Sequence, residues 1–504
     1  MIKNGVGRWI PKSYTPFVSD DDFKSKKRKQ VKKASSGETI FLQSLSEVFN
    51  KLNIKDGMTL SFHHHYRNGD HLLNMVAKEI VKRNLKNITL APSGIFPVHE
   101  PIIPLLLNKN VTQIVTNYVS GPVAESISRG DLEKVLIMDT HGGRARAIEA
   151  GDLNIDIAFI AASAVDKKGN ANGVDGKNPC GPLGYIIPDV LYAKHKVVVT
   201  DTIVSSLTTT EINGNDVDYV VTVNAIGDSS GIETGTTQMT RDPVQLKIAR
   251  DTVRLLKDLD VIQNGFSFQT GAGATSIAVS HYLKDEMEKR QLKGRFVSGG
   301  ITAKIVELFE SSYFAELYDV QSFDLTAVNS YKNNQKHHFM DASLYANPFE
   351  PNNIARQLDV VILGAAEVDL DFNVNVTTSS THQLIGGSGG HSDTAYEAKL
   401  TVITTNLFKS RIPFIRQRVQ TVSTPGSSVD VVVTERGIAI NPKRTDLIEK
   451  LKDSQLNIVT IDELYQLVTQ ITGQPKSIST SDKIIGLIRY RDGTIIDTIR
   501  EVKK

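Results

Sequence analysis

The chain has 504 residues, with 58 lysines and arginines, 56 aspartates and glutamates, one cysteine and one tryptophan. This length predicts roughly two to four domains of about 100–200 residues, and the 40% hydrophobic and 23% charged fractions exclude wholesale disorder and fibrous repeats. No apolar run approaches the ~18–20 residues of a membrane helix, and the single Cys180 excludes an intrachain disulfide and a cysteine-rich zinc site. We therefore expect a cytoplasmic protein without a membrane partner.

The net charge of +2 is unevenly distributed along the chain. Residues 1–35 carry ten basic residues and three aspartates, a net charge of +7, which leaves −5 for the other 469 residues. We expect a basic N-terminal tail over residues 1–35, centred on Lys24–Lys33, that is solvated and poorly ordered. Binding to nucleic acid, a membrane or an acidic protein is the alternative for such a tail. Because the body is mildly acidic, the overall charge does not support a nucleic-acid partner.

The body alternates short β-branched runs with amphipathic stretches. The expected strands are Asn87–Ala91, Val135–Asp139, Ile155–Ala162, Lys196–Asp201, Tyr219–Asn224, Val360–Ala365 and Val429–Thr434. The clearest helix is Pro243–Leu259, since Asp242 is a good N-cap and Pro243 occupies the first helical position. Such alternation predicts an α/β fold with mainly parallel sheets.

A weak internal repeat indicates two similar domains. Ile157–Gly173 and Val360–Val376 each read as a buried strand, then an aspartate, then Asn-x-Asn. We therefore predict two tandem, structurally similar α/β domains, covering residues 36–235 and 236–504, with the junction near Gly231–Asp242.

The segment SFHHHYRNGD, Ser61–Asp70, contains three consecutive histidines. On a strand, His63 and His65 would share a face, but zinc needs at least three protein ligands and no third is evident. We expect no metal, and instead assign His63, His65 and Arg67 to substrate binding. A packed histidine cluster is the alternative.

The segment THGGRARAIEAGD, Thr140–Asp152, follows an expected strand. Its glycine turn would bring His141, Arg144 and Arg146 to the carboxyl end of that strand, where open α/β sheets bind ligands. Arginine forks match carboxylates, so these residues suit a polycarboxylate substrate. If the segment is helical, however, the two arginines diverge.

Three glycine-rich segments could face a phosphate or an oxyanion. Gln269–Ser276 contains Gly271 and Gly273 and leads into an amphipathic stretch, Ala274–Gln291, but lacks the third glycine of a dinucleotide fingerprint. Phe296–Lys304 contains Gly299 and Gly300. The densest cluster is Gly386, Gly387, Ser388, Gly389, Gly390 and His391. A plain structural turn is the alternative for each segment.

Taken in order, these motifs resemble the coenzyme A-transferase superfamily, and within it the citrate lyase alpha subunit family. The resemblance rests on SFHHHYRNGD, APSGIFPVHEPIIPL, THGGRARAIEAGD, DKKGNANG, TGAGATS, VSGGIT, EVDLDFNVNV, GGSGGHSDTA and STPGSSVDVVVTERGIAI, which span about residues 36–445 in one colinear order. It implies two related α/β CoA-transferase-type domains.

The resemblance also implies a mechanism. Relatives that form an enzyme–CoA thioester carry a catalytic glutamate at about Gly299, yet no glutamate lies between Lys293 and Glu307. A direct transfer is therefore expected, in which acetyl carrier protein and citrate give citryl carrier protein and acetate through a mixed anhydride. We assign backbone groups of Gly386–Gly390, Gly299 and Gly300 to catalysis, and Gly271, Gly273 and His391 to the CoA-like arm.

The family resemblance further implies the partners. They are a small acyl carrier (gamma) subunit bearing a phosphoribosyl-dephospho-CoA arm, for which acetyl-CoA is a surrogate, and a citryl lyase (beta) subunit, in an oligomeric complex that serves citrate fermentation. No cofactor is expected to be bound covalently to this chain. Another CoA-transferase, acting on acetate and citramalate or a related acid, and a non-catalytic assembly subunit are the alternatives.

Overall fold

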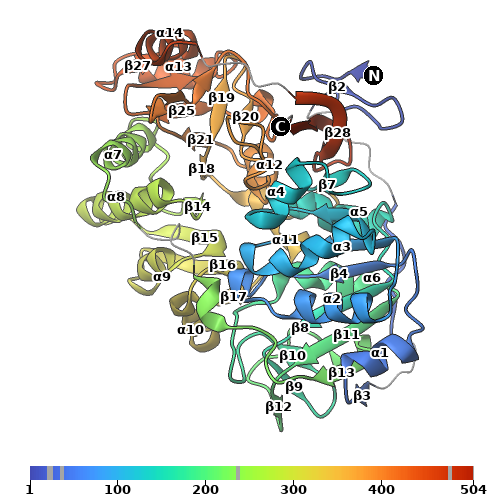
Figure 1. The fold of residues 1–504 in the computed structure, drawn as a ribbon. Coiled ribbons are helices and arrows are strands. Elements are labelled where there is room, and N and C mark those ends of the chain that lie inside the picture. Colours follow the sequence, from blue (N-terminus) through green and yellow to red (C-terminus); the bar gives the residue numbers. More distant parts are fainter. Residues whose placement is uncertain (20–26, 35–38, 234–238, 475–479, 503–504) are drawn as a thin grey trace.

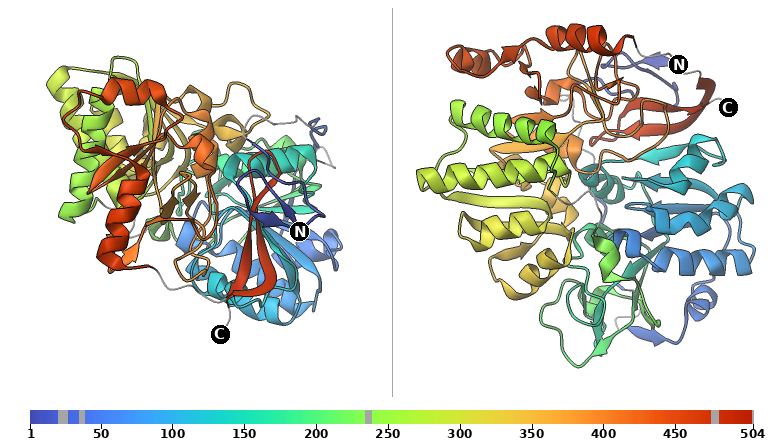
Figure 2. Two further views of the ribbon diagram at one scale, coloured as in Figure 1. Left: turned by 90° about the horizontal axis from the view of Figure 1, so that it is seen from above. Right: turned by 60° about the vertical axis from the view of Figure 1, so that its left-hand side comes forward.

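The computed structural model describes residues 1–19, 27–34, 39–233, 239–474 and 480–502 (Figure 1). Within them the chain forms two α/β lobes that lie side by side (Figure 2), each built on a large sheet. The predicted junction, Gly231–Asp242, includes residues 234–238, which lie outside the described ranges. The predicted fold class, two α/β units with mainly parallel sheets, is confirmed.

The first lobe contains a ten-stranded sheet whose neighbouring strands are all parallel except for the two C-terminal strands, which pair antiparallel at one edge. In spatial order its strands are β29 (Ile495–Val502), β28 (Thr480–Arg489), β7 (Leu136–Met138), β6 (Val111–Thr116), β5 (Ile88–Pro92), β4 (Thr59–Phe62), β8 (Ile157–Ala161), β11 (His195–Thr200), β13 (Tyr219–Thr222) and β3 (Ile40–Leu42). Runs such as Val197–Val199 are buried throughout, as expected for a parallel sheet covered on both faces.

The second lobe contains a nine-stranded sheet, parallel except between β25 and β26. Its order is β17 (His337–Phe339), β16 (Phe314–Ser322), β15 (Gly294–Ile301), β14 (Ser267–Thr270), β18 (Val360–Gly364), β21 (Thr401–Thr404), β25 (Val431–Thr434), β26 (Gly437–Ile440) and β27 (Ile458–Val459). All the strands expected from the sequence are therefore present, with ends shifted by at most two residues.

Helices connect these strands and cover the sheets (Figure 1). The first lobe has α1 (Leu45–Lys51), α2 (Leu72–Lys82), α3 (Ile103–Leu107), α4 (Pro122–Ser128), α5 (His141–Ala150) and α6 (Ile187–Tyr192). The second has α7 (Pro243–Asp258), α8 (Ala274–Arg290), α9 (Ala303–Glu310), α10 (Leu325–Asn333), α11 (Ala342–Ala346), α12 (His391–Glu397), α13 (Thr445–Leu451) and α14 (Ile461–Thr472). As predicted, Asp242 caps α7 by accepting from the Val244 N–H.

The internal repeat corresponds to matching three-stranded sheets. In the first lobe β10 (Ala171–Asn172), β9 (Ala164–Asp166) and β12 (Ile203–Val204) pair in this order, and in the second β20 (Val374–Asn375), β19 (Glu367–Asp369) and β24 (Ile415–Arg416) do the same. Asp166 Oδ1 accepts from the N–H of Lys168 and Asn170, and Asp369 Oδ1 accepts from the N–H of Asp371 and Asn373. The repeated aspartate thus closes the same turn in both lobes.

The C-terminal strands return to the first lobe. β28 pairs with β7 in parallel and with β29 in antiparallel orientation, and Leu487 and Ile496 are buried in the first core. The predicted domain boundary at residue 236 therefore assigns these two strands to the second domain, although they pair with the sheet of the first lobe. Strand pairing between segments about 350 residues apart leaves no periodic signal in the sequence.

The expectation of a solvated N-terminal tail is wrong for residues 1–19, whereas residues 27–33 are exposed and lie outside helices and strands. Strands β1 (Ile2–Lys3) and β2 (Trp9–Ile10) form a hairpin, and Ile10 and Phe17 are 0% and 2% exposed because they pack on the first core. Of the basic cluster, Arg28 lies 2.9 Å from Glu149 and Lys33 lies 2.9 Å from Asp216. Carboxylates of the first lobe thus pair with part of the positive charge, and residues 20–26 and 35–38 lie outside the described ranges.

Candidate active site at the lobe interface

The three histidines follow the carboxyl end of β4 instead of lying within the strand. The ring of His64 stacks against that of His141, with centroids 5.6 Å apart, and against Tyr185 at 5.0 Å. The His63 and His65 rings lie 6.2 Å apart. Gln321, at the end of β16, donates from Nε2 to the His64 carbonyl at 2.8 Å. The fold therefore brings His63, His65 and His141 into one cluster at the contact between the lobes. Their role in substrate binding stays a prediction.

Several polar atoms in this cluster are buried without a hydrogen-bond partner. They are both ring nitrogens of His63, Nε2 of His65, Nδ1 of His141, Oδ1 of Asn117 and Oε1 of Gln321. Buried polar atoms are nearly always paired in folded proteins, so these atoms have hydrogen-bonding capacity available for water or a ligand. The interface thus offers donors and acceptors to a polar molecule that contacts both lobes.

The histidines of the cluster are uncharged near neutral pH. Burial, followed by the Arg144 charge, lowers the pKa of His63 well below its usual value. Burial lowers the pKa of His65 to about 3, and burial together with Arg144 lowers that of His141 to about 3. Neutral rings can donate and accept hydrogen bonds but offer no positive charge to a ligand.

The glycine-rich loop Gly386–Gly390 packs directly on the first lobe. The His141 N–H donates to the Gly389 carbonyl at 2.8 Å, and a Cβ on Gly387 would lie 2.2 Å from the Asn117 carbonyl oxygen. Gly389 has a φ of +52°, which a larger side chain rarely adopts. Ser388 is buried, and its Oγ lies 2.8 Å from Ser392 Oγ. Glycine is thus required here for close approach between the lobes.

Gly299 and Gly300 lie at an irregularity in the pairing of β15 with β16. Gly299 has a φ of +114°, and a Cβ there would lie 2.9 Å from the Gln269 side chain. Gln269 donates to Tyr345 Oη at 2.9 Å, and a Cβ on Gly390 would lie 2.3 Å from that oxygen. The two predicted catalytic glycine segments are therefore neighbours, joined through Gln269 and Tyr345.

The predicted substrate ligands Arg144 and Arg146 have other partners. Both lie on helix α5 and diverge, as a helical segment requires. Arg144 is 3% exposed and donates to both Asp189 oxygens, at 2.8 and 3.1 Å, and to Ser61 and Ala91. Arg146 donates to Asp152 and to the Arg491 carbonyl. Since buried charges need their partners, these contacts oppose a role for either arginine as a substrate ligand.

Arg67, the third predicted arginine, lies between the lobes. Its guanidinium carbon is 4.6 Å from the ring centre of Phe323 and 5.7 Å from that of Phe96, and it donates to the Ile232 carbonyl at 3.3 Å. Aromatic faces stabilise a cation in such positions. Among the predicted arginines, Arg67 therefore has the contacts that best suit a substrate carboxylate at this interface.

The predicted ligands of the CoA-like arm differ from one another. Gly273 is the N-cap of α8 and is exposed, with open space around it, and Gly271 precedes it; their role stays a prediction. His391 is buried, and its two ring nitrogens lie 2.8 Å from Thr424 Oγ1 and 3.0 Å from the Gly364 carbonyl. Because both nitrogens are used, the geometry gives His391 a role in fixing α12 instead of the predicted arm-binding role.

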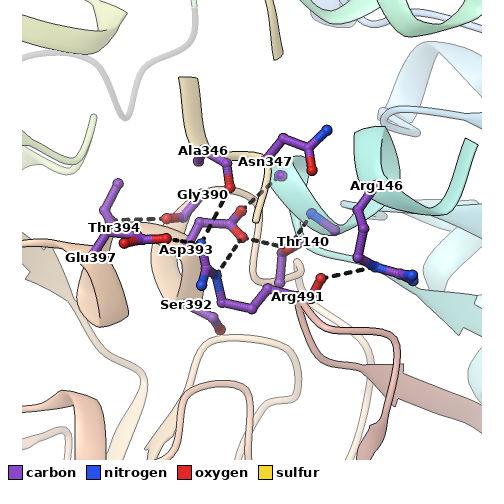
Figure 3. A network of polar contacts seen from close by, with 12 residues as sticks. Thr140, Arg146, Ala346, Asn347, Gly390, Ser392, Asp393, Thr394, Glu397 and Arg491 are labelled. Atoms are coloured by element: carbon purple, nitrogen blue, oxygen red, sulfur yellow. Dashed lines mark hydrogen bonds and ion pairs between the residues drawn. The ribbon is translucent and has the colours of Figure 1, made fainter. Parts of the chain in front are cut away.

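A buried charged network joins the glycine loop to helix α5 (Figure 3). Asp393, in the first turn of α12, accepts from Thr140 Oγ1 and from the Gly142 N–H, both at 2.8 Å. Arg491, in the turn between β28 and β29, lies 3.5 Å from Asp393 and pairs with Glu397. The network thus connects both lobes and the C-terminal hairpin.

Sequence reasoning did not single out several residues of this interface. They are His64, Asn117, Tyr185, Gln269, Gln321, Tyr345, Asp393 and Arg491. His64, Gln269 and Asp393 lie within quoted segments, and their presence there was the available signal. The others are isolated residues of a strand, a helix or a turn, and the sequence contains no spacing that would have identified them.

Within the described ranges, no group of three or more histidine, cysteine, aspartate or glutamate side chains is arranged to hold a metal ion. Across those same ranges, no helix has the length and apolar character needed to span a membrane.

The fold is shared with proteins of the CoA-transferase type. A malonate decarboxylase hetero-tetramer from Pseudomonas, in complex with malonate, has a chain that matches at a TM-score of 0.66 with 16% identity, over 86% of both chains. In sequence, succinyl-CoA:acetate CoA-transferase from Clostridium kluyveri is 36% identical over 107 residues, 20% of each chain. These matches define the class as an α/β protein with a CoA-transferase-like fold.

More similar proteins define the family. The model of the citrate lyase alpha subunit family matches residues 38–502. The citrate lyase alpha chain of Escherichia coli K12 is 41% identical over 462 residues, 92% of this chain and 91% of the relative. The citrate lyase alpha subunit of Streptococcus mutans, whose crystal structure is a complex with citrate, matches with a TM-score of 0.95 and 44% identity over 100% of both chains. The chain belongs to the citrate lyase alpha subunit family.

Proposed function

We propose that the chain exchanges acetate for citrate on a thioester of an acyl carrier subunit, acting in the cytoplasm as the transferase of a multi-subunit lyase. The observation that most directly supports this proposal is a set of buried polar atoms without hydrogen-bond partners at the lobe interface. These atoms belong to His63, His65, His141, Asn117 and Gln321. Family membership and the citrate complex of the Streptococcus mutans relative support citrate as the molecule that binds there.

The proposed chemistry consists of two acyl transfers. A citrate carboxylate oxygen attacks the acetyl thioester carbonyl, the C–S bond breaks, and the thiolate leaves with its electron pair. The thiolate then attacks the citryl carbonyl of the mixed anhydride, the C–O bond breaks, and acetate leaves. No proton is gained or lost overall, so the site needs no general base and must instead hold the reactants together and stabilise two oxyanions.

The chain's own groups suit these tasks. Backbone N–H groups of Gly386–Gly390, except that of Gly389, which donates to the Asn117 carbonyl at 3.4 Å, and those of Gly299 and Gly300 are proposed to stabilise the oxyanions. The neutral histidines hydrogen-bond citrate oxygens, and the Arg67 charge offsets a spare carboxylate. Gly271 and Gly273, at the exposed start of α8, face the arm of the carrier.

The position of Gly299 supports direct transfer without an enzyme–CoA intermediate. β15 contains no carboxylate side chain over its described length, Gly294–Ile301. The transferase alternative that forms a glutamyl–CoA adduct needs a carboxylate nucleophile at this place. Direct transfer needs no such nucleophile, because the acyl group never becomes bonded to the chain.

The test combines the purified chain, citrate and acetyl-CoA, with mass-spectrometric detection of citryl-CoA, acetate and any adduct. We expect citryl-CoA and acetate in equal amounts and no adduct after borohydride treatment. Preference for succinate or citramalate over citrate, or a glutamyl–CoA thioester that borohydride reduces and so traps as a modified glutamate, would favour another CoA-transferase. Failure of the chain to turn over any acid, with the fold intact, would favour an assembly subunit.

A further inference from the structure

A cavity that lies away from the histidine cluster has three arginines in its lining, together with one carboxylate, Asp497. Its volume is about 300 Å³, and it is lined among others by Arg8, Trp9, His382, Arg418, Thr421 and Arg500. These residues come from the N-terminal hairpin, from two loops of the second lobe and from β29. Four segments distant in sequence thus form one basic cavity.

The arginines of this cavity are held in place by backbone carbonyls and by two carboxylates, the buried Asp497 and the exposed Asp482. Arg8 donates from one terminal nitrogen to the Val419 carbonyl at 2.6 Å, and Arg418 donates to the Gly7 carbonyl at 2.6 Å. Arg500 donates to Asp482 at 3.4 Å. Each guanidinium has five N–H donors, so these bonds orient the groups and leave donors for a ligand. A site oriented in advance loses less conformational entropy on binding.

Positive charge exceeds negative charge at this place. The buried Asp497 carboxylate lies 3.3 Å from Arg8 Nε, whereas the Asp482 side chain is fully exposed. Burial and the charges of Arg416 and Arg8 lower the pKa of His382 below its usual value, which is the expected effect of a positive field on a neighbouring imidazole. An anion is therefore favoured in the cavity, and arginine forks match phosphate oxygens.

Trp9 adds a flat apolar surface to the basic groups. Trp9 is 56% exposed. The exposed part of its indole gains no hydrophobic stabilisation from folding and is available to a ligand. Exposed tryptophan beside arginine is suited to stacking on a planar ring. The hairpin that carries Trp9 precedes residue 38, where the match to the family model begins, whereas the lining residues between His382 and Arg500 lie within the matched range.

We propose that this cavity binds a nucleoside phosphate, with the phosphate on Arg418 and Arg500 and the base against Trp9. The site is separate from the proposed acyl-transfer site, since none of its residues contacts the histidine cluster or the loop Gly386–Gly390 among the described contacts. The proposal therefore stands or falls independently of the proposed function.

The chain's single tryptophan makes the test specific. Because Trp9 is the only tryptophan, a change in fluorescence excited selectively at tryptophan reports on the surroundings of this residue. The full-length chain is titrated with ADP, inorganic phosphate and adenosine at constant ionic strength. The same titrations are made with Arg418→Ala, Arg500→Ala and, as a matched control on an exposed turn outside the cavity, Arg436→Ala.

We expect ADP to quench Trp9 with saturation and to bind more tightly than either phosphate or adenosine. Arg418→Ala and Arg500→Ala should each weaken ADP binding by about tenfold or more, while Arg436→Ala leaves it unchanged, and all three should retain wild-type transfer of citrate. Absence of a saturable signal with ADP in the wild type would overturn the proposal. Equal affinity for ADP and inorganic phosphate, or equal affinity in the two cavity variants and the control, would overturn it as well.

Discussion

Asp393 accepts a 2.8 Å hydrogen bond from Thr140 Oγ1, although the two residues are 253 positions apart and belong to different lobes. The same carboxylate accepts from the Gly142 N–H, at the start of the helix that presents His141. Figure 3 shows that Arg491 approaches this carboxylate from the C-terminal hairpin. Asp393 therefore holds the two lobes in one alignment at the candidate site.

Asp393→Asn should lower kcat more than it changes the KM for citrate. The amide has one acceptor oxygen, so it cannot accept from both Thr140 and Gly142, and it no longer balances the Arg491 charge. We expect kcat to fall by about tenfold or more with KM changed by less than about threefold, measured in the citrate and acetyl-CoA assay. A purely structural role would instead lower the melting temperature and leave kcat of the folded fraction unchanged.

The pH dependence of this variant gives a second measurement. Burial raises the pKa of Asp393 to about 6, and the neighbouring charges are Arg491 and Glu397. The wild-type kcat should therefore decline as pH falls through about 6, and Asp393→Asn should lack this decline. Because the folded-state pKa exceeds the unfolded one, the contribution of Asp393 to stability should fall as pH rises from about 4 to about 6.

His63→Ala and His65→Ala should raise the KM for citrate by about tenfold each, because each removes hydrogen bonds to the substrate. The KM for acetyl-CoA should change little. His281→Ala, on helix α8 outside the cluster, is the matched control and should behave as the wild type. An unchanged citrate KM in both cluster variants would contradict the assignment.

The same histidines should remain neutral over the physiological range. Since burial lowers the pKa of His65 to about 3, its NMR signals should not titrate between about pH 5 and 8. The folded-state pKa lies below the unfolded value, so the stability contributed by these residues should decline as pH falls from about 6.5 toward about 3.

Arg144→Ala should act on stability. It leaves Asp189 buried without its cation, and breaking a buried pair in this way costs about 3–5 kcal/mol. Chemical denaturation of Arg144→Ala should show this loss in the free energy of unfolding. Arg129→Ala breaks an exposed pair with Asp131 at 3.6 Å and should cost less than about 1 kcal/mol. A stable Arg144→Ala chain with a greatly raised citrate KM would restore Arg144 as a substrate ligand.

Gly387→Ala should impair turnover by moving the glycine loop. Its Cβ would lie 2.2 Å from the Asn117 carbonyl oxygen, a backbone atom that cannot move aside easily. We expect kcat to fall by about a hundredfold, because the loop is displaced from the oxyanions it is proposed to stabilise. At Gly364 a Cβ has open space, so Gly364→Ala is the control and should be close to wild type in the same assay.

Local features were predictable from the sequence. The β-branched runs of β8, β11 and β25 and the capped helix α7 were placed within two residues, since short-range sterics and capping set their ends. The aspartate and Asn-x-Asn repeat identified two related lobes because each aspartate bonds backbone groups only a few residues away.

Side-chain partners distant in sequence were not predictable. Two arginines in THGGRARA suggest binding of a substrate carboxylate, but the carboxylate that Arg144 binds is that of Asp189 in the same chain. Arg146 lies two positions further along the helix and therefore points away from Arg144, toward Asp152 and the Arg491 carbonyl. His391 appeared free in the motif, whereas Thr424 and Gly364 hold both its nitrogens. Likewise, the basic N-terminus appeared solvated until its hairpin was seen to pack beside β29.

The sequence alone determined that this chain is an α/β protein of the citrate lyase alpha subunit family, with histidines and glycine loops as its candidate chemistry. The tertiary structure decided that the C-terminal hairpin completes the first sheet, that His141 lies beside Gly389, and that Arg144 is paired internally. The reason is physical: backbone propensity and capping act over a few residues, whereas ion pairs and lobe contacts depend on which distant segments the fold brings together.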